Sequence, residues 1–130
     1  MVTRIEKETF KTGPEGIPGN DDFGATSGVF LWNALGFYPA VPGVGGLVLG
    51  TPMFRRATID LSGGRTLVVR GEGTGPYVQG VAFNGTPYSK TWLPLSTLKS
   101  GTSELVFRLS TEPNRERGKA IGDRPPSFTD

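Results

Sequence analysis

A short run of polar side chains near the N-terminus could carry chemistry. Asn20, Asp21 and Asp22 follow Gly19, and an apolar run begins at Ala25. Carboxylates that precede a helix are stabilised as anions, because the helix dipole and the unpaired amide groups of the first turn favour negative charge there. The two aspartates therefore suit the role of a base or a metal ligand better than that of an acid.

Two interpretations of the aspartates remain open at this point. In the first, Asp22 caps the helix and Asp21 is its solvated neighbour, which the pattern alone favours. In the second, one of them is the base of a hydrolase. Glycoside hydrolysis needs two carboxyl groups about 5 to 9.5 Å apart on either side of the bond, and neighbouring side chains in an extended loop point in opposing directions. The acid would therefore come from Glu15 or from outside the chain.

Composition excludes several other classes of site. The 130 residues contain neither His nor Cys, which removes His-based triads, cysteine nucleophiles and zinc sites built on thiolate or imidazole. The 14 Lys and Arg residues barely exceed the 12 Asp and Glu residues, so a nucleic-acid partner is not expected. No apolar run has membrane-spanning length, so no membrane association is expected either.

The apolar spacing in residues 25–35 predicts a helix buried on most of its circumference, and Gly36 is placed to end it. After Pro42 the pattern changes to short strands, with hairpin connections at residues 62–64 and at Asn84-Gly85. Strands are predicted at 47–49, 55–61, 66–70, 77–83, 86–88 and 103–109, with one helical turn at 95–99. Residues 1–12 are too sparsely apolar to predict an element, and Gly71, Gly73 and Gly75 are interpreted as a flexible turn.

These elements predict an α+β, mostly β fold, in which one buried helix precedes a small antiparallel sheet or sandwich. We place a boundary after residue 43, an antiparallel β module at 44–112 and a polar tail at 113–130. The tail is predicted to be disordered or extended, because it is polar and contains three prolines.

The aromatic residues have a structural and a functional interpretation. The run at residues 37–39 is expected to pack the end of the helix into a core, although such a run can also form the floor of a sugar site. Trp92, Tyr88 and Tyr77 suit the core or edge of a sheet. In a carbohydrate-binding module they would instead offer a stacking surface.

One stretch, GIPGNDDFGATSGVFLWNALGFYPAVPG, resembles the C-terminal signature of the glycoside hydrolase family 92 exo-acting α-mannosidases. The resemblance continues through LGTPMFRRATIDL, VAFNGTPYSKTWL and ELVFRLSTEPN, and it covers most of residues 13–114. It is specific because several uncommon motifs match in order and spacing.

The resemblance implies part of a calcium-dependent inverting enzyme that removes mannose from mannose-rich glycans. It implies that Gly19 and Asn20 contact substrate and that Asp21 or Asp22 is the general base, and it leaves the metal ligands unknown. Residues 1–43 would then be the end of a helical-toroid catalytic domain, with the helix at 25–35 as a late toroid helix.

The resemblance also implies what lies outside this chain. The general-acid glutamate of the family belongs to an upstream segment, so residues 1–130 alone are expected to be inactive and to depend on the rest of the catalytic domain. The parent protein is expected to be secreted, periplasmic or on the cell surface.

Two alternatives remain from the sequence. The chain could be a non-catalytic, β-rich carbohydrate-binding or accessory module. It could also be a fragment without independent function, which an exposed apolar face on the helix at 25–35 would favour.

Overall fold

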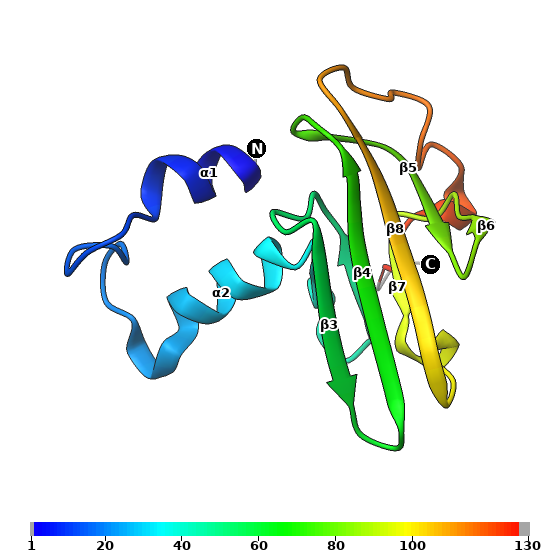
Figure 1. The fold of residues 1–130 in the computed structure, drawn as a ribbon, viewed down its shortest axis with the longest axis horizontal. Coiled ribbons are helices and arrows are strands. Elements are labelled where there is room, and N and C mark those ends of the chain that lie inside the picture. Colours follow the sequence, from blue (N-terminus) through cyan, green and yellow to red (C-terminus); the bar gives the residue numbers. More distant parts are fainter. Residues whose placement is uncertain (1, 128–130) are drawn as a thin grey trace.

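A computed structural model describes residues 2–127 and consists of a helical layer beside two β-sheets (Figure 1). Predictions for Met1, at the start of the N-terminal segment, and for residues 128–130, at the end of the polar tail, lie outside the described residues. The helices are α1 (Val2–Thr9) and α2 (Ala25–Ala34), with short 3-10 turns η1 (Asp22–Gly24), η2 (Leu95–Thr97) and η3 (Ile121–Asp123). The strands are β1 (Phe37–Tyr38), β2 (Gly46–Leu49), β3 (Arg56–Leu61), β4 (Arg65–Gly73), β5 (Tyr77–Phe83), β6 (Thr86–Pro87), β7 (Trp92–Pro94) and β8 (Gly101–Ser110).

The strands form two sheets that share one core. One sheet has the order β1-β2-β7 and the other the order β3-β4-β8-β5-β6. Apolar side chains from both sheets meet between them, which is the arrangement of a small sandwich. The largest fully buried side chains in this core are Phe107, Leu67, Leu93, Leu105 and Val69. The mostly β character predicted from the sequence is therefore confirmed.

The antiparallel prediction is wrong for the central pair of strands. β4 and β8 run parallel, in a register from Arg65 opposite Gly101 to Gly73 opposite Leu109. Parallel strands need a long crossover, and here the intervening chain forms β5, β6, β7 and η2 before it returns. The remaining pairs in both sheets are antiparallel.

Most predicted strands occur where the periodicity placed them. β5 covers residues 77–83, and the Asn84-Gly85 connection has a positive φ at both positions, 49° and 78°, as a tight hairpin turn requires. The flexible turn predicted around Gly71 and Gly73 is wrong, because both residues continue β4. Only Gly75 lies in the turn that follows.

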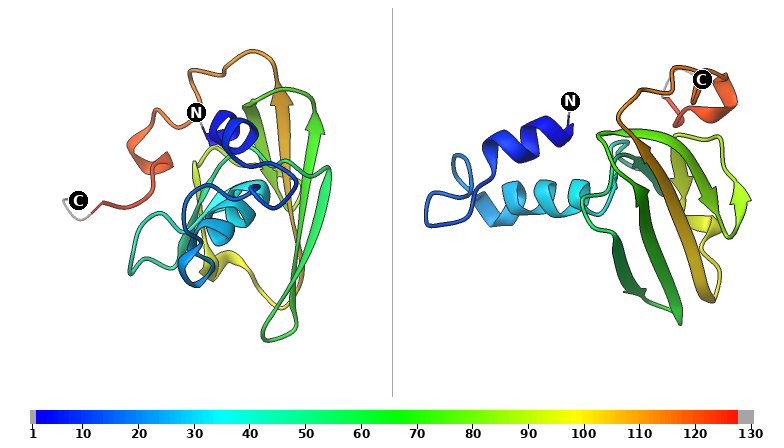
Figure 2. Two further views of the ribbon diagram at one scale, coloured as in Figure 1. Left: turned by 90° about the vertical axis from the view of Figure 1, so that its left-hand side faces the viewer. Right: turned by 45° about the horizontal axis from the view of Figure 1, so that its top comes forward.

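The prediction of one buried helix is wrong in two respects. The sparse segment at the N-terminus forms α1, and the Phe10 ring just beyond it stacks against Phe30 of α2 at a centroid distance of 4.7 Å. In α2 only Ala34 is buried, although most of its side chains are apolar and they are not confined to one face. The two helices lie side by side and project from the sheets (Figure 2), so much of the surface of α2 lacks a cover within this chain.

The described part of the polar tail is fixed by hydrogen bonds, so of the two predicted alternatives, disordered or extended, the first is wrong. Apart from η3 it has no regular secondary structure. The main-chain oxygen of Asp123 accepts hydrogen bonds from the amide of Thr91 at 2.7 Å and from its hydroxyl at 2.9 Å. The Arg117 guanidinium donates to the main-chain oxygen of Lys90 at 2.7 Å. Polar side chains do not bury apolar area, but their donors and acceptors can still fix a segment to a sheet edge.

Within residues 2–127, no helix is long and apolar enough to cross a membrane. The division at residue 43 remains a prediction. β1 lies before that boundary and pairs with β2 after it, with Phe37 opposite Leu49.

Candidate functional site

The loop that carries the two aspartates is built from left-handed backbone. Gly19 and Gly24 have φ values of 67° and 77°, which glycine adopts without steric cost. Among residues 2–127, no heavy atom lies within 4 Å of a β-carbon built at either glycine, so backbone conformation rather than crowding by these residues requires them. The loop therefore turns sharply on both sides of the aspartates before α2 begins.

Asp21 is fastened to the first turn of α2 by Ser27. The Ser27 amide donates to Asp21 Oδ1 at 2.9 Å, and the Ser27 hydroxyl donates to Oδ2 at 2.5 Å. Ser27 is the third residue of the helix, and its amide has no acceptor within the helix. The carboxylate of Asp21 thus caps α2, a role that the sequence interpretation had given to Asp22.

These contacts also make Asp21 a weaker base. The pKa of the Asp21 carboxyl lies below its ordinary value, first because of the Ser27 hydroxyl and second because of the Ser27 amide. Hydrogen bonds to the charged form favour that form. Asp21 is therefore held as an anion in a fixed orientation.

Asp22 has the opposite environment. Its side chain is exposed, and it has no hydrogen-bond or ion-pair partner among residues 2–127. Each oxygen of Asp21 accepts one hydrogen bond from Ser27, whereas the oxygens of Asp22 accept none from residues 2–127. Of the two candidate bases, only Asp22 has a side chain without a partner among the described residues.

The two predicted substrate-binding residues lie on the same loop. The main-chain oxygen of Asn20 accepts a hydrogen bond from the Thr26 hydroxyl at 3.2 Å, which ties the loop to α2 a second time. The Asn20 side chain is exposed beside Asp21, and Gly19 provides the preceding turn. Glu15, the alternative acid, lies on an exposed turn closed by the Lys11 amide and the Gly16 carbonyl at 2.9 Å.

Sequence reasoning missed Phe23, which stands next to Asp22. Phe23 has φ 54° and ψ 24°, a conformation that costs energy in a bulky residue, and its side chain is fully exposed. The left-handed backbone could not be read from the sequence, because the neighbouring Gly24 is the more obvious place for it. Strained backbone and an exposed aromatic ring thus coincide beside the free carboxylate.

Among the described residues no group of three or more Asp or Glu side chains is arranged to hold a metal ion. Calcium takes six to eight oxygen ligands, mostly from carboxylates, carbonyls and water. The residues on the loop therefore do not form a calcium site by themselves.

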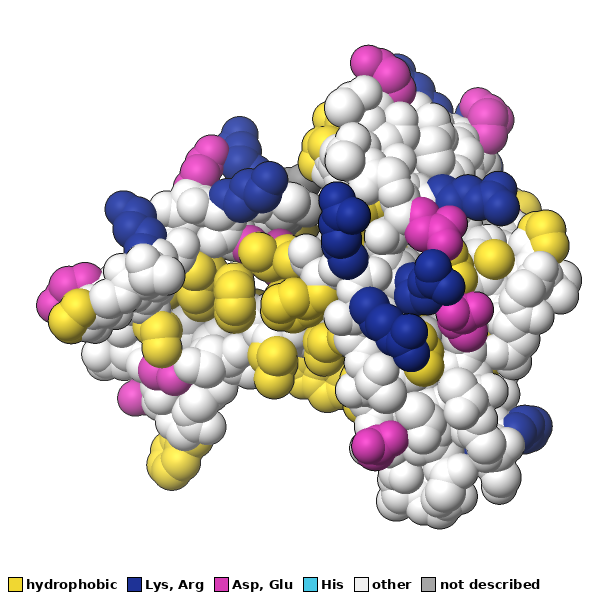
Figure 3. Space-filling view, in the orientation of Figure 1, with side chains coloured by type: hydrophobic (Ala, Val, Ile, Leu, Met, Phe, Trp, Pro, Cys, Tyr) yellow, Lys and Arg dark blue, Asp and Glu magenta, His cyan; other side chains and the backbone are white. Residues whose placement is uncertain are grey.

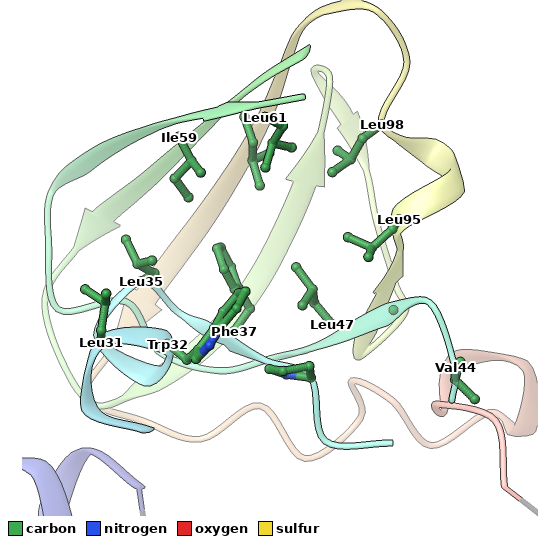
Figure 4. Close-up of a pocket in the computed structure, with 13 residues that line it drawn as sticks. Leu31, Trp32, Leu35, Phe37, Val44, Leu47, Ile59, Leu61, Leu95 and Leu98 are labelled. Carbon is green, nitrogen blue, oxygen red and sulfur yellow. The ribbon is translucent and has the colours of Figure 1, made fainter. Parts of the chain in front are cut away.

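A large hollow in the chain lies away from the aspartates. It has a volume of about 440 Å³ and opens between the end of α2 and the two sheets (Figure 4). Its walls are almost entirely apolar. None of Gly19, Asn20, Asp21 and Asp22 lines it, whereas Phe37 and Pro39 of the aromatic run at residues 37–39 do. A sugar site needs convergent polar groups, so this hollow is not a candidate for glycan binding.

The aromatic residues of the alternative carbohydrate module are engaged in packing. The Tyr88 ring lies 6.0 Å from that of Phe83, and its hydroxyl donates to the main-chain oxygen of Trp92 at 2.9 Å. The Lys90 ammonium lies over the Trp92 ring at 5.8 Å from its centroid. Tyr77 alone is substantially exposed. No aromatic platform for stacking is therefore assembled from these residues.

Comparison with known proteins links the chain to one family. A model of the glycosyl hydrolase family 92 catalytic domain matches residues 1–111. An uncharacterized secreted glycosidase from Arthroderma benhamiae is 30% identical over 126 residues, which cover 92% of this chain and 16% of that protein.

Solved structures match over almost the whole chain. An inverting family 92 mannosidase from Bacteroides thetaiotaomicron VPI-5482 has a TM-score of 0.89 at 30% identity, over 99% of this chain and 18% of the other. A family 92 α-mannosidase from Bacteroides thetaiotaomicron, in complex with mannoimidazole, has a TM-score of 0.90 at 28% identity, over 98% and 17%. The chain thus spans about a sixth of the length of these relatives.

Proposed function

Because the chain belongs to the glycosyl hydrolase family 92, we propose that it works within a longer inverting α-mannosidase and supplies the general base. The observation that carries this proposal is the contrast between neighbouring carboxylates. Asp21 is locked by Ser27, whereas Asp22 is exposed and free. The names of the similar structures, which include one inverting mannosidase and one mannoimidazole complex, support mannose-containing glycans as the substrate class.

In this proposal Asp22 accepts a proton from the water molecule that attacks the anomeric carbon. In inverting enzymes the water attacks from the face opposite the leaving oxygen, and the two carboxyl groups lie about 6.5 to 9.5 Å apart. Asp21 keeps the loop in place through Ser27. The acid that protonates the leaving oxygen comes from the part of the enzyme outside residues 1–130.

The loop residues before the aspartates complete the proposed site. The exposed side-chain amide of Asn20 would hydrogen-bond a sugar hydroxyl, and the turn at Gly19 precedes it on the loop that carries Asp22. Calcium dependence is also part of the proposal. Since the described residues do not form a calcium site, its ligands would come largely from outside this chain, and no step is assigned to it.

The proposal is tested by measuring turnover of an α-mannoside by the complete enzyme and its Asp22→Asn variant. We expect the variant to lose about 10²- to 10⁴-fold in kcat with an unchanged unfolding temperature, because only the proton acceptor is removed. Asp21→Asn is expected to lose most turnover as well, because the neutral amide weakens the bonds to Ser27. NMR identifies the anomer of mannose that is released first, and we expect its configuration to be inverted relative to the substrate.

Glu15→Gln serves as the matched control on the same segment. It is expected to retain normal turnover, because Glu15 is not assigned as the acid. A near-normal rate for Asp22→Asn, or release of mannose with retained configuration, would contradict the proposal. Mannose release by residues 1–130 alone would contradict the part of it that places the acid elsewhere.

A further inference from the structure

A carboxyl group without a partner lies on the inner side of α1. Glu6 is the buried residue of this helix, with only 4% of its surface exposed, while Val2 and Ile5 are 48% and 46% exposed. Neither Oε1 nor Oε2 of Glu6 has a hydrogen-bond partner within residues 2–127. The pKa of the Glu6 carboxyl is raised by burial, which penalises the charged form.

Beside Glu6 is a hollow of about 420 Å³ between the two helices and the loop. Its walls are mostly apolar and include Phe10, Ile17, Phe30 and Met53. Lys7 and Lys11 also line it, but neither forms an ion pair with Glu6 in the described chain. The hollow is open enough to admit a side chain, and its one buried polar group is an acid.

A buried carboxyl group of this kind is costly and uncommon. More than nine in ten buried polar groups in native proteins have a hydrogen-bond partner, and an uncompensated one carries its full desolvation penalty. The exposed apolar residues of both helices indicate that further protein covers this layer. Figure 3 shows hydrophobic side chains gathered over α2 and at its junction with the sheets.

We propose that the hollow beside Glu6 receives a segment of the same enzyme from outside residues 1–130, and that this segment carries a Lys or Arg side chain that pairs with Glu6. The inference rests on the proposed function only in that the chain works within a longer protein. The matched relatives are about six times as long as this chain, so most of such a protein remains to provide the segment.

The side chains that line the hollow favour a basic partner for Glu6. A second carboxylate would repel Glu6, and a purely apolar segment would leave its charge uncompensated in a drier environment. A divalent ion would need several further oxygen ligands, and the described residues offer no such group. A cationic side chain with a long aliphatic stem satisfies both the apolar walls and the acid.

The test compares thermal unfolding of the complete protein and its Glu6→Met variant, which keeps the size of the side chain and removes its charge. We expect the unfolding midpoint to fall by about 5 °C or more, because a buried cation would lose its partner. The matched control is Glu8→Met on the same helix. Glu8 makes only an exposed ion pair with Arg4 at 3.5 Å, so the midpoint should hardly change.

In residues 1–130 alone, the same substitution should change the unfolding midpoint in the opposite direction. Here the basic partner is absent, so Glu6→Met removes an uncompensated buried acid and should raise the midpoint by about 4 °C or more. If Glu6→Met prevents the complete protein from folding, Glu6→Gln is measured in its place and is expected to lower the midpoint by a smaller amount.

A lower midpoint in the complete protein, together with a higher midpoint in residues 1–130, supports the pairing of Glu6 with a Lys or Arg side chain. A rise or no change in the complete protein would overturn it, since Glu6 would then lack a cationic partner. A fall in both settings would also overturn it, because the helices themselves would then need Glu6. The readout is stability, so a complete protein that lacks mannosidase activity would refute the proposed function and leave this test intact.

Discussion

At the residue scale, the two adjacent carboxylates before α2 differ in their hydrogen bonds and in their exposure. The hydroxyl and amide of Ser27 hold Asp21, and the chain direction then places Asp22 toward solvent. Two identical side chains thereby differ, because one carboxylate is held by hydrogen bonds and the other is exposed without a partner among the described residues. Their difference arises from the partner that each one finds and not from the residue type.

We predict that Ser27→Ala in the 130-residue chain raises the pKa of Asp21 toward its ordinary value. The substitution removes the hydroxyl, which is the leading cause of the lowered pKa, and leaves the amide donor in place. Carboxyl chemical shifts followed by NMR through an acid titration give the measurement. Thr26→Ala is the control, because its hydroxyl bonds to the Asn20 carbonyl and not to the Asp21 carboxylate. An unchanged Asp21 titration in Ser27→Ala would contradict the assignment.

The same contact has a consequence for stability at low pH. Because the pKa of Asp21 is lower in the folded chain than in the unfolded chain, its stabilising contribution is present above the unfolded value. That contribution is lost as the pH falls through the folded value. In an acid titration of Ser27→Ala, we therefore expect a smaller loss of stability from the protonation of Asp21.

The sequence located the loop that carries the two carboxylates but not the contacts that each of them makes. Glycines around an Asn-Asp-Asp run before an apolar helix predicted the position of the carboxylates. It could not predict that Asp21, rather than Asp22, would cap the helix, because this depends on the left-handed turn at Phe23 and Gly24. Local periodicity carries no information about which of two adjacent side chains a turn directs toward the helix.

At the element scale, short-range patterns predicted strands well and their partners poorly. The β5 strand and the Asn84-Gly85 hairpin follow from alternation and turn residues that lie close together in the sequence. The parallel pairing of β4 with β8 joins residues 36 positions apart, as for Arg65 and Gly101. Such pairing is decided by the shared core of Leu67, Leu105 and Phe107, which no local signal reports.

The tail shows a second limit of prediction from sequence. Its low apolar content suggested disorder. Its hydrogen bonds to the segment before β7 instead fix it to the sandwich. Gly118 approaches Thr91 closely: a β-carbon at Gly118 would lie 2.4 Å from Thr91 Cγ2, and its φ is 77°. Composition alone cannot predict so close an approach.

We predict that Gly118→Ala destabilises the 130-residue chain by about 1–3 kcal/mol, because it adds both a clash and backbone strain. The midpoint of urea denaturation gives the measurement. Gly122→Ala is the matched control in the same tail, since no atom lies within 4 Å of its added methyl group. Equal, small effects of the two substitutions would mean that the tail does not contribute to stability.

At the scale of the whole molecule, the sandwich has a buried apolar core, whereas apolar side chains of α2 remain exposed. The sandwich buries its apolar residues between two sheets, whereas α2 is mostly apolar and has only Ala34 buried. A helix that is apolar all round normally lies inside a protein. This contrast agrees with a chain that spans about a sixth of its relatives, and it was the outcome expected of a fragment.

The exposed surface of α2 leads to a prediction for the 130-residue chain. Leu31 is 56% exposed on the rim of the large apolar hollow, where Trp32 and Leu35 also lie (Figure 4). Large contiguous apolar patches bind hydrophobic probes and promote association. We therefore expect the chain to enhance the fluorescence of an anilinonaphthalene sulfonate dye, and Leu31→Gln to reduce that enhancement.

The control is Ile121→Gln, which removes a more exposed apolar side chain, 81% accessible, from the tail. Ile121 does not line the hollow, so its substitution should leave the fluorescence unchanged. Equal reductions in the two variants would show that the dye reports exposed apolar area in general. A reduction confined to Leu31→Gln locates the uncovered surface at α2, because the dye then depends on the contiguous hollow and not on exposure alone.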